Sequence, residues 1–320
     1  MISQNTSIGL NLSNYRRVGE FILLGLTSNR DIQILLFVVF LSFYVTSLMG
    51  NIIIIIIYIR SSRLHTPMYF FLSNLSVLDI CYTSCIVPKM LIHFQSMKKT
   101  ISFNGCVTQM FIYLTLGSTE CYLLLSMAYD RYVAICNPLL YTNIMHPALC
   151  VRMAIGSWVG GVINAIVHTV LALQLPFCGP NVINNFFCEV VSVLELACAD
   201  TSFNKIIIFF FAVLVVMGPF FLILITYGFI ISSILKIQTS VGRRKAFSTC
   251  ASHITVVSLF YGTAIFMYMK PGSTHVENQD KMATLFYSVI TPMLNPLIYT
   301  LRNKDVIGAF LDLARKDFVR

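Results

Sequence analysis

The first residues that suggest chemistry are three in succession, Asp130-Arg131-Tyr132, which close a long apolar stretch. A charged side chain at the end of a membrane helix costs free energy unless it reaches the lipid headgroups or an opposite charge. Asp130 can neutralise Arg131 locally, and a change elsewhere in the protein could release the arginine. Pro138 ends the helical pattern a turn or two later. The triplet is therefore expected to act as a switch at one membrane face.

Two further acids, Asp79 and Glu120, fall within apolar stretches. Ionisable residues at that depth usually mark functional sites. Asn51 and Asn295 are expected at a similar depth, where they would add amide oxygens. The group could hold a monovalent cation, the two carboxyls could share one proton, or the cluster could be hydrogen-bonded packing without an ion. A monovalent cation in this cluster is favoured over the other two interpretations, and no other cofactor is expected.

Four of the ten cysteines lie outside the apolar stretches: Cys106, Cys178, Cys188 and Cys198. An even set in an oxidising compartment indicates disulfides, and four cysteines allow three pairings. Pairing Cys106 with a cysteine of the later loop would tie that loop across the mouth of a helix bundle. The other pair would then close a hairpin within the loop. Zinc is less favoured because no histidine stands at finger spacing nearby.

The remaining signals for chemistry are weak. His168 and His253 could bind a metal or sense pH, but histidines that pack between helices are the more frequent case. No HExxH or GxSxG string occurs in the sequence, so we do not expect an enzyme.

The composition indicates that these residues are positioned by membrane helices. Of 320 residues 57% are hydrophobic and 11% charged, with a mean hydropathy of +0.79. Soluble domains carry about 25% charged residues. The net charge of +9 could suggest a nucleic-acid partner, but the charges cluster between the apolar stretches. We therefore expect a polytopic protein in the lipid bilayer and no binding of nucleic acid.

Seven apolar stretches are long enough to cross a bilayer. They run over about 32–58, 67–92, 104–135, 149–172, 203–235, 246–269 and 282–301. The predicted fold is an all-α membrane protein, a seven-transmembrane helix bundle followed by a short cytoplasmic amphipathic helix. The expected organisation is an extracellular tail (1–31), the helix domain (32–302, with a long extracellular loop at about 173–202) and a cytoplasmic tail (303–320).

Orientation follows from the sequons and from the basic residues. Asn5 and Asn11 stand in Asn-x-Ser/Thr sequons, and a glycan acceptor must face the lumen. Under that topology most Lys and Arg residues fall on the side of Asp130, as the positive-inside tendency requires. In the tail, Val306 and Phe310 recur at helical spacing, typical of a helix on the inner leaflet. We expect a multi-pass plasma-membrane protein with its N-terminus outside and its C-terminus inside.

Four strings together resemble the vertebrate olfactory receptors, a family of rhodopsin-like G protein-coupled receptors. They are LHTPMYFFLSNLSVLD (Leu64 to Asp79), MAYDRYVAIC (Met127 to Cys136), KAFSTCASH (Lys245 to His253) and PMLNPLIYTLRN (Pro292 to Asn303). The resemblance covers nearly the whole chain and is greatest to the class II (tetrapod-type) receptors. KAFSTCASH and the FYGT string from Phe260 replace the CWxP of most rhodopsin-like receptors.

The resemblance implies a role for each matching position. The G protein side would comprise Asp130, Arg131, Tyr132, Tyr227, Lys245, Asn295, Pro296 and Tyr299. It also implies the disulfides Cys106–Cys188 and Cys178–Cys198, and the sodium-type site at Asp79 and Glu120. The implied partners are a small-molecule odorant and the heterotrimeric stimulatory (olfactory-type) G protein, which raises cyclic AMP.

The resemblance further implies a ligand pocket in the outer half of the bundle. Its expected residues are Tyr113, Leu114, Gly117, Ser118, Asn164, His168, Phe211, Ala212, Val215, Tyr261, Ala264, Ile265 and Tyr268. Apart from Asn164 and His168 these residues are apolar or hydroxyl-bearing, and none is an acid, a lysine or an arginine. Tyr113 stands where amine receptors carry an aspartate. Only Lys270, near the rim, could meet a carboxylic acid. We therefore predict a small, neutral, largely apolar odorant.

Two other interpretations remain. A transporter would usually show inverted repeats and helices broken at the midplane, and the sequence has no internal repeat. A rhodopsin-like receptor with a non-olfactory chemosensory role would carry the same strings.

Overall fold

The computed structural model describes residues 18–179, 181–268, 281–282, 284–301 and 306–312. Within these residues six helices are long and apolar enough to cross a membrane. They are α1 (Arg30–Arg60), α2 (Pro67–Gln95), α3 (Phe103–Cys136), α5 (Pro147–Leu173), the continuous pair α7 (Ser202–Ala212) and α8 (Gly218–Leu235), and α9 (Ser240–Tyr268). The seventh predicted span contains a π-helical segment (Phe286–Ile290) followed by α11 (Thr291–Leu301). The predicted seven-helix membrane bundle is confirmed.

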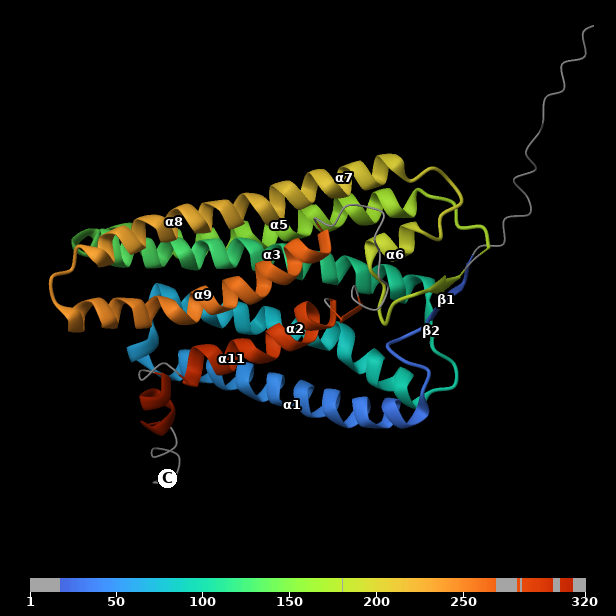
Figure 1. Cartoon of the computed structure of the whole chain (residues 1–320), viewed down its shortest axis with the longest axis horizontal. Helices are drawn as coiled ribbons and strands as arrows, with labels where there is room; N and C mark the ends of the chain where they lie inside the picture. Colours follow the sequence, from blue (N-terminus) through green and yellow to red (C-terminus); the bar gives the residue numbers. More distant parts are fainter. Residues whose placement is uncertain (1–17, 180, 269–280, 283, 302–305, 313–320) are drawn as a thin grey trace, which may run out of the picture.

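The long helices lie side by side along the long axis of the molecule (Figure 1). Local sequence sets where several of them begin. Pro67 and Pro147 occupy the first turns of α2 and α5, where a missing N–H costs nothing. Asn29 caps α1 by accepting hydrogen bonds from two backbone amides, and Ser102 caps α3 by accepting one from the amide of Gly105.

Short elements connect the spans. They are the 3₁₀ turns Ser62–Leu64 and Pro138–Leu140, the helices α4 (Tyr141–Ile144) and α6 (Val190–Leu194), and the strands β1 (Glu20–Leu23), β2 (Thr100–Ser102) and β3 (Val182–Ile183). We call the end of the bundle that carries the strands the strand end. The opposite end, which carries Arg131, is called the arginine end.

The strands form a small sheet of order β2-β1-β3 that the sequence did not predict. β1 pairs antiparallel with β2 and parallel with β3, so the first described strand joins two loops that are far apart in sequence. Phe21 of β1 is buried and packs against Phe103 and Phe177, with ring centroids 5.9 and 6.2 Å away. The segment before the first span is therefore part of the fold at the strand end.

Two spans contain a π-helical segment, and each lies just before a proline. Val213–Met217 joins α7 to α8, and Pro219 follows it by two residues. Phe286–Ile290 precedes Pro292 by the same interval. Proline has no backbone N–H and so cannot donate a hydrogen bond to the preceding helical turn. In both segments the amide that follows the last π residue, Gly218 or Thr291, donates to the carbonyl five positions back. The prolines account for the position of both π turns.

The tail returns to the arginine end as a helix over 306–312. Val306 and Ala309 are buried against Ile57 of α1 and Leu64, whereas Phe310 is 47% exposed. Val306 and Phe310, which the sequence placed on one apolar face, are thus separated: Val306 packs onto the bundle and Phe310 does not. That the helix lies on the inner leaflet remains a prediction.

Candidate functional site

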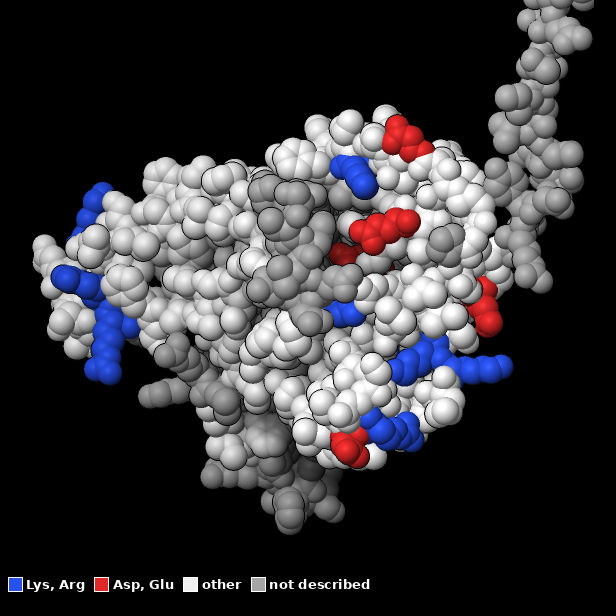
Figure 2. Space-filling model, turned by 45° about the vertical axis from the view of Figure 1, so that its right-hand side comes forward, with Lys and Arg blue, Asp and Glu red and all other residues white. Residues whose placement is uncertain are grey.

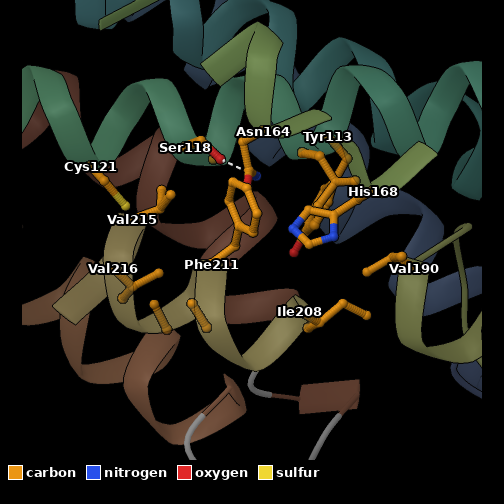
Figure 3. Close-up of a pocket in the computed structure, with 14 residues that line it drawn as sticks. Tyr113, Ser118, Cys121, Asn164, His168, Val190, Ile208, Phe211, Val215 and Val216 are labelled. Atoms are coloured by element: carbon orange, nitrogen blue, oxygen red, sulfur yellow. Dashed lines mark hydrogen bonds between the residues drawn. The ribbon is translucent and has the colours of Figure 1, made fainter. Parts of the chain in front are cut away.

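A cavity of about 60 Å³ lies between α3, α5 and the α7–α8 span, in the half of the bundle nearer the strand end (Figure 3). Its lining is Tyr113, Leu114, Gly117, Ser118, Cys121, Asn164, His168, Val190, Ile208, Phe211, Ala212, Val215, Val216 and Ala264. None of these residues is an acid, a lysine or an arginine. The cavity therefore suits a neutral, mostly apolar molecule.

Ten of the thirteen residues that we predicted for the pocket line this cavity, and Tyr261 and Ile265 do not. Tyr261 is fully buried because its hydroxyl donates to the backbone carbonyl of Cys121 at 3.1 Å and its ring packs on Phe220. The structure thus assigns Tyr261 to the contact between α9 and α3 instead of the cavity wall. The side chain of Tyr268 lies outside the described residues, as does Lys270.

Sequence reasoning missed four lining residues: Cys121, Val190, Ile208 and Val216. Cys121 and Ile208 lie one helical turn from predicted residues, so a longer face would have included them. Val216 lines the cavity together with Val215 because both belong to the π-helical segment, where an extra residue enters the turn. Val190 comes from the long loop, and helical periodicity carries no signal for it.

A disulfide positions Val190 over the cavity. Cys188 is bonded to Cys106 at the start of α3, with 5.4 Å between the Cα atoms, and Val190 follows two residues later at the start of α6. The side chain of Gln109 accepts a hydrogen bond from the amide of Cys188 at 2.9 Å and donates to the carbonyl of Cys85 on α2. The loop is therefore held to α3 by a covalent bond and to α2 through Gln109.

A second disulfide, between Cys178 and Cys198, closes a hairpin within the same loop across 20 residues. An isolated bridge between Phe177 and Ala197 pairs the backbone next to it. The structure thus contains the two pairings that the resemblance implied.

A polar cluster lies deeper in the bundle. Asp79 is fully buried on α2, and both of its oxygens accept from Asn295 Nδ2, at 3.2 and 3.0 Å. Glu120 and Asn51 are also buried. Among the described residues no hydrogen bond reaches Asn51 Oδ1, Glu120 Oε1 or Asn295 Oδ1. Buried oxygens without donors are costly, and a cation would satisfy them.

At the arginine end Asp130 holds two partners. Its Oδ2 accepts from Arg131 Nε at 3.0 Å and from Arg131 Nη2, and its Oδ1 accepts from the hydroxyl of Tyr141 at 2.7 Å. Asp130 is fully buried, so this pairing neutralises it within the bundle. Sequence reasoning missed Tyr141, which belongs to the short α4 helix. We call this arrangement, in which Arg131 is paired with Asp130, the locked form.

Tyr132 faces another way. Its ring lies 6.1 Å from that of Phe229 on α8 and 6.3 Å from that of Tyr129.

Two residues of α11 that the sequence assigned to the G protein side are placed by the structure. Tyr299 is buried. Pro296 packs against Gly50 of α1 so closely that a Cβ at that glycine would lie 2.8 Å from the proline ring. The side chain of Lys245 lies outside the described residues.

His253 connects three spans near the same end. Its Nδ1 lies 2.7 Å from the Tyr227 hydroxyl on α8, and its Nε2 lies 3.1 Å from the Leu124 carbonyl on α3. A carbonyl only accepts, so Nε2 carries the hydrogen and Nδ1 accepts from Tyr227. The histidine is thus satisfied by packing between helices.

The charged surface differs between the two ends. In the view of Figure 2 both acids and bases appear at the strand end, whereas only Lys and Arg are visible at the arginine end. Described basic residues there include Arg152, Lys236, Arg243 and Arg244. The predicted glycosylation sites, Asn5 and Asn11, lie outside the described residues.

Comparison with known proteins agrees with this architecture. The sequence profile of the family described as "Olfactory receptor" matches residues 40–315. Olfactory receptor 2B6 of Mus musculus is 51% identical over 307 residues, which cover 96% of this chain and 98% of that protein. Olfactory receptor 13C9 of Homo sapiens is 52% identical over 305 residues, which cover 93% and 96%. Olfactory receptor-like protein OLF3 of Canis lupus familiaris is 52% identical over 300 residues, which cover 94% and 95%. The chain therefore belongs to the olfactory receptor family: it is a multi-pass membrane receptor for odorants that signals through a G protein, and it is not an enzyme.

Proposed function

We propose that this receptor binds a small, neutral, largely apolar odorant in the cavity between α3, α5 and α7–α8, and thereby activates a stimulatory, olfactory-type G protein that raises cyclic AMP. The observation that carries the ligand class is the lining, which is mostly apolar and has no acid, lysine or arginine. An amine or a carboxylate would leave its charge unpaired there, and burying an unpaired charge costs on the order of several kcal/mol.

The proposed orientation places the strand end outside the cell and the arginine end in the cytoplasm, within the plasma membrane. Disulfides persist in oxidising compartments, and both lie at the strand end. The basic surface at the other end would face the cytoplasm, in agreement with the positive-inside tendency. The G protein would then meet Arg131 and its neighbours on the inner face.

The proposed mechanism is a shift between two populations. The described form holds Arg131 against Asp130 and holds α9 against α8 and α3 through His253. An odorant that binds better to a form with a tightened cavity favours a state in which the inner end of α9 moves outward and Arg131 is released. Pro292 and Pro296 lower the helical regularity of the seventh span and provide a hinge there.

We further propose that the polar cluster binds a sodium ion, with Asp79 and Glu120 as carboxylate ligands. Asn51 Oδ1, Glu120 Oε1 and Asn295 Oδ1 lack donors among the described residues, so the cluster offers oxygens that suit a hard cation. The ion would supply positive charge to two buried acids and stabilise the locked form.

A cyclic AMP reporter assay with a broad panel of neutral, cationic and anionic odorants tests the function. We expect neutral agonists only, and we expect the response to disappear in Arg131→Ala at equal surface expression. Agonists that are exclusively amines or acids would contradict the ligand class. Responses that persist without Arg131, or ligand-driven currents without cyclic AMP, would contradict the proposed coupling.

The sodium proposal has a separate test. Thermal unfolding of the purified receptor is measured in sodium chloride and in choline chloride at equal ionic strength. We expect sodium to raise the melting temperature of the wild type and to have no such effect in Glu120→Gln. An equal response of both proteins to sodium would contradict the site.

A further inference from the structure

The few polar groups of the cavity are concentrated on one wall. Tyr113 and Ser118 of α3 and Asn164 and His168 of α5 all belong to this wall (Figure 3). The opposite wall, from α7–α8, is apolar and includes Phe211, Val215 and Val216. A bound molecule would therefore meet polar atoms on one side only.

The hydrogen bonds within that wall are incomplete. Asn164 Nδ2 donates to Ser118 Oγ at 2.8 Å. Among the described residues, Asn164 Oδ1 receives no hydrogen bond, although Asn164 is only 6% exposed. The Ser118 hydroxyl accepts this hydrogen bond, and among the described residues it donates none. The pair thus presents one unused acceptor and one unused donor side by side.

The unused pair selects among neutral functional groups. A hydroxyl group can donate and accept at once, so it satisfies both Asn164 Oδ1 and the Ser118 hydroxyl. A ketone, aldehyde, ester or ether only accepts, and it would leave Asn164 Oδ1 without a donor in a site from which it has excluded water. A hydrocarbon would leave both groups unsatisfied.

We infer that the receptor is tuned to alcohols or phenols, with the ligand hydroxyl donating to Asn164 Oδ1 and accepting from Ser118, and with the apolar body against Phe211, Val215 and Val216. This inference rests on the proposed function, since it names the functional group of the odorant that the cavity takes. The size of the cavity, about 60 Å³, favours a compact molecule.

The test compares ligands that share a carbon skeleton. Alcohols with linear, branched and aromatic six- to eight-carbon skeletons are each paired with the aldehyde or ketone, the methyl ether and the hydrocarbon. Activation is measured in receptor-expressing cells, and binding is measured as the thermal shift of the purified receptor, which needs no G protein. An unsatisfied buried acceptor lowers affinity by about tenfold to a hundredfold, so the best alcohol should exceed its matched ether by about that factor.

Variants locate the effect at the proposed contact. Asn164→Leu keeps the branched shape and the number of heavy atoms of the side chain but removes its acceptor, so the advantage of the alcohol over the ether should disappear. The matched control is Thr169→Val on the same helix: Thr169 is also buried and its hydroxyl also lacks a partner among the described residues, but it does not line the cavity. The control should keep the full preference. If Asn164→Leu does not reach the cell surface, Ser118→Ala is tested in its place. The difference in affinity between the alcohol and its matched ether should then be smaller than in the wild type.

The outcomes separate this inference from the proposed function. Carbonyl compounds or ethers that match the alcohols, a preference that survives Asn164→Leu, or agonists found only among molecules without a hydroxyl would overturn the inference and leave the odorant receptor intact. A surface-expressed receptor that responds to no odorant of the broad panel, in either readout, would contradict the proposed function itself.

Discussion

The hydroxyl of Tyr141 donates a 2.7 Å hydrogen bond to Oδ1 of Asp130, the carboxylate that also pairs with Arg131. Burial and the nearby Asp130 carboxylate raise the pKa of the Tyr141 phenol above its ordinary value. A raised pKa extends the range of the protonated form, so the phenol remains a donor at every physiological pH. The contact fixes the loop helix α4 to the end of α3 and, in the proposed mechanism, helps to hold Arg131 in the locked form.

Replacing Tyr141 with Phe should raise the ligand-independent activity of the receptor. The change removes from the locked form one hydrogen bond to a charged acceptor, worth about 1.5–3 kcal/mol. The ratio of released to locked receptor should therefore rise by roughly tenfold to a hundredfold. The measurement is basal cyclic AMP at matched surface expression. Tyr129→Phe is the control, because Tyr129 is 38% exposed and its hydroxyl has no bond to a described residue. Equal basal activity in both variants would show that the Tyr141 bond does not restrain Arg131.

The contact between α3 and α5 depends on Gly161. A Cβ at this position would lie 2.5 Å from the backbone carbonyl of Thr115 and would overlap the hydroxyl of Thr119. That hydroxyl already donates to the Thr115 carbonyl at 2.7 Å, so neither group can move away freely. Gly161→Ala should therefore destabilise the receptor by about 1–3 kcal/mol or more and reduce its amount at the cell surface.

The control for that substitution lies on the same helix. Nothing lies within 4 Å of a Cβ built at Gly156, so Gly156→Ala should leave surface expression unchanged or slightly increased. Flow cytometry of tagged receptors measures both. Similar losses in the two variants would mean that helix composition matters and the close approach to α3 does not.

The bond between Tyr227 and His253 should stabilise the described form. Tyr227→Phe leaves His253 Nδ1 buried without a donor and should cost about 1–3 kcal/mol of stability. The neighbouring Thr226→Val is the control, because Thr226 is only half-buried and its hydroxyl donates to the Leu222 carbonyl of its own helix. Thermal unfolding of the two purified variants distinguishes them. A melting temperature in Tyr227→Phe that equals that of the control would contradict the stated role.

The two disulfides should differ in their effect on ligand response. Replacing Cys106 and Cys188 with Ala frees the segment that holds Val190 over the cavity, so the odorant response should be lost even where some receptor reaches the surface. Replacing Cys178 and Cys198 opens only a hairpin of 20 residues, which costs about 3 kcal/mol and should lower expression more than potency. Dose-response curves normalised to surface expression test this difference.

The sequence predicts the spans well because hydrophobic length is a strong signal. The first span, expected at 32–58, is observed at Arg30–Arg60. The sixth, expected from 246, begins at Ser240, because its first turn is polar and basic and continues the helix beyond the apolar stretch. The strands were not predicted because each has only two to four residues, too few for a strand signal, and they form a sheet only when the fold brings them together.

The site was predictable where a helix face stays regular. Tyr113, Gly117 and Ser118 follow helical spacing along α3, and all three line the cavity. Tyr261 shares such a face on α9, yet a hydrogen bond to the Cys121 carbonyl turns it into a packing residue. Spacing tells which residues share a face, whereas the partner that each side chain finds depends on neighbouring spans. Tyr141 is the clearest case, since nothing in the sequence near it indicates Asp130.

The π turns before Pro219 and Pro292 have a consequence for how these spans tolerate change in chain length. Each π turn accommodates one residue more than a regular helix would, so side chains on its two sides follow different phases. Removing a single residue from Val213–Met217 would convert the turn into regular helix without rotating the remainder of the span. Such a deletion should be accepted inside the membrane, whereas the same deletion in the middle of α3 would turn half of the binding cavity toward lipid.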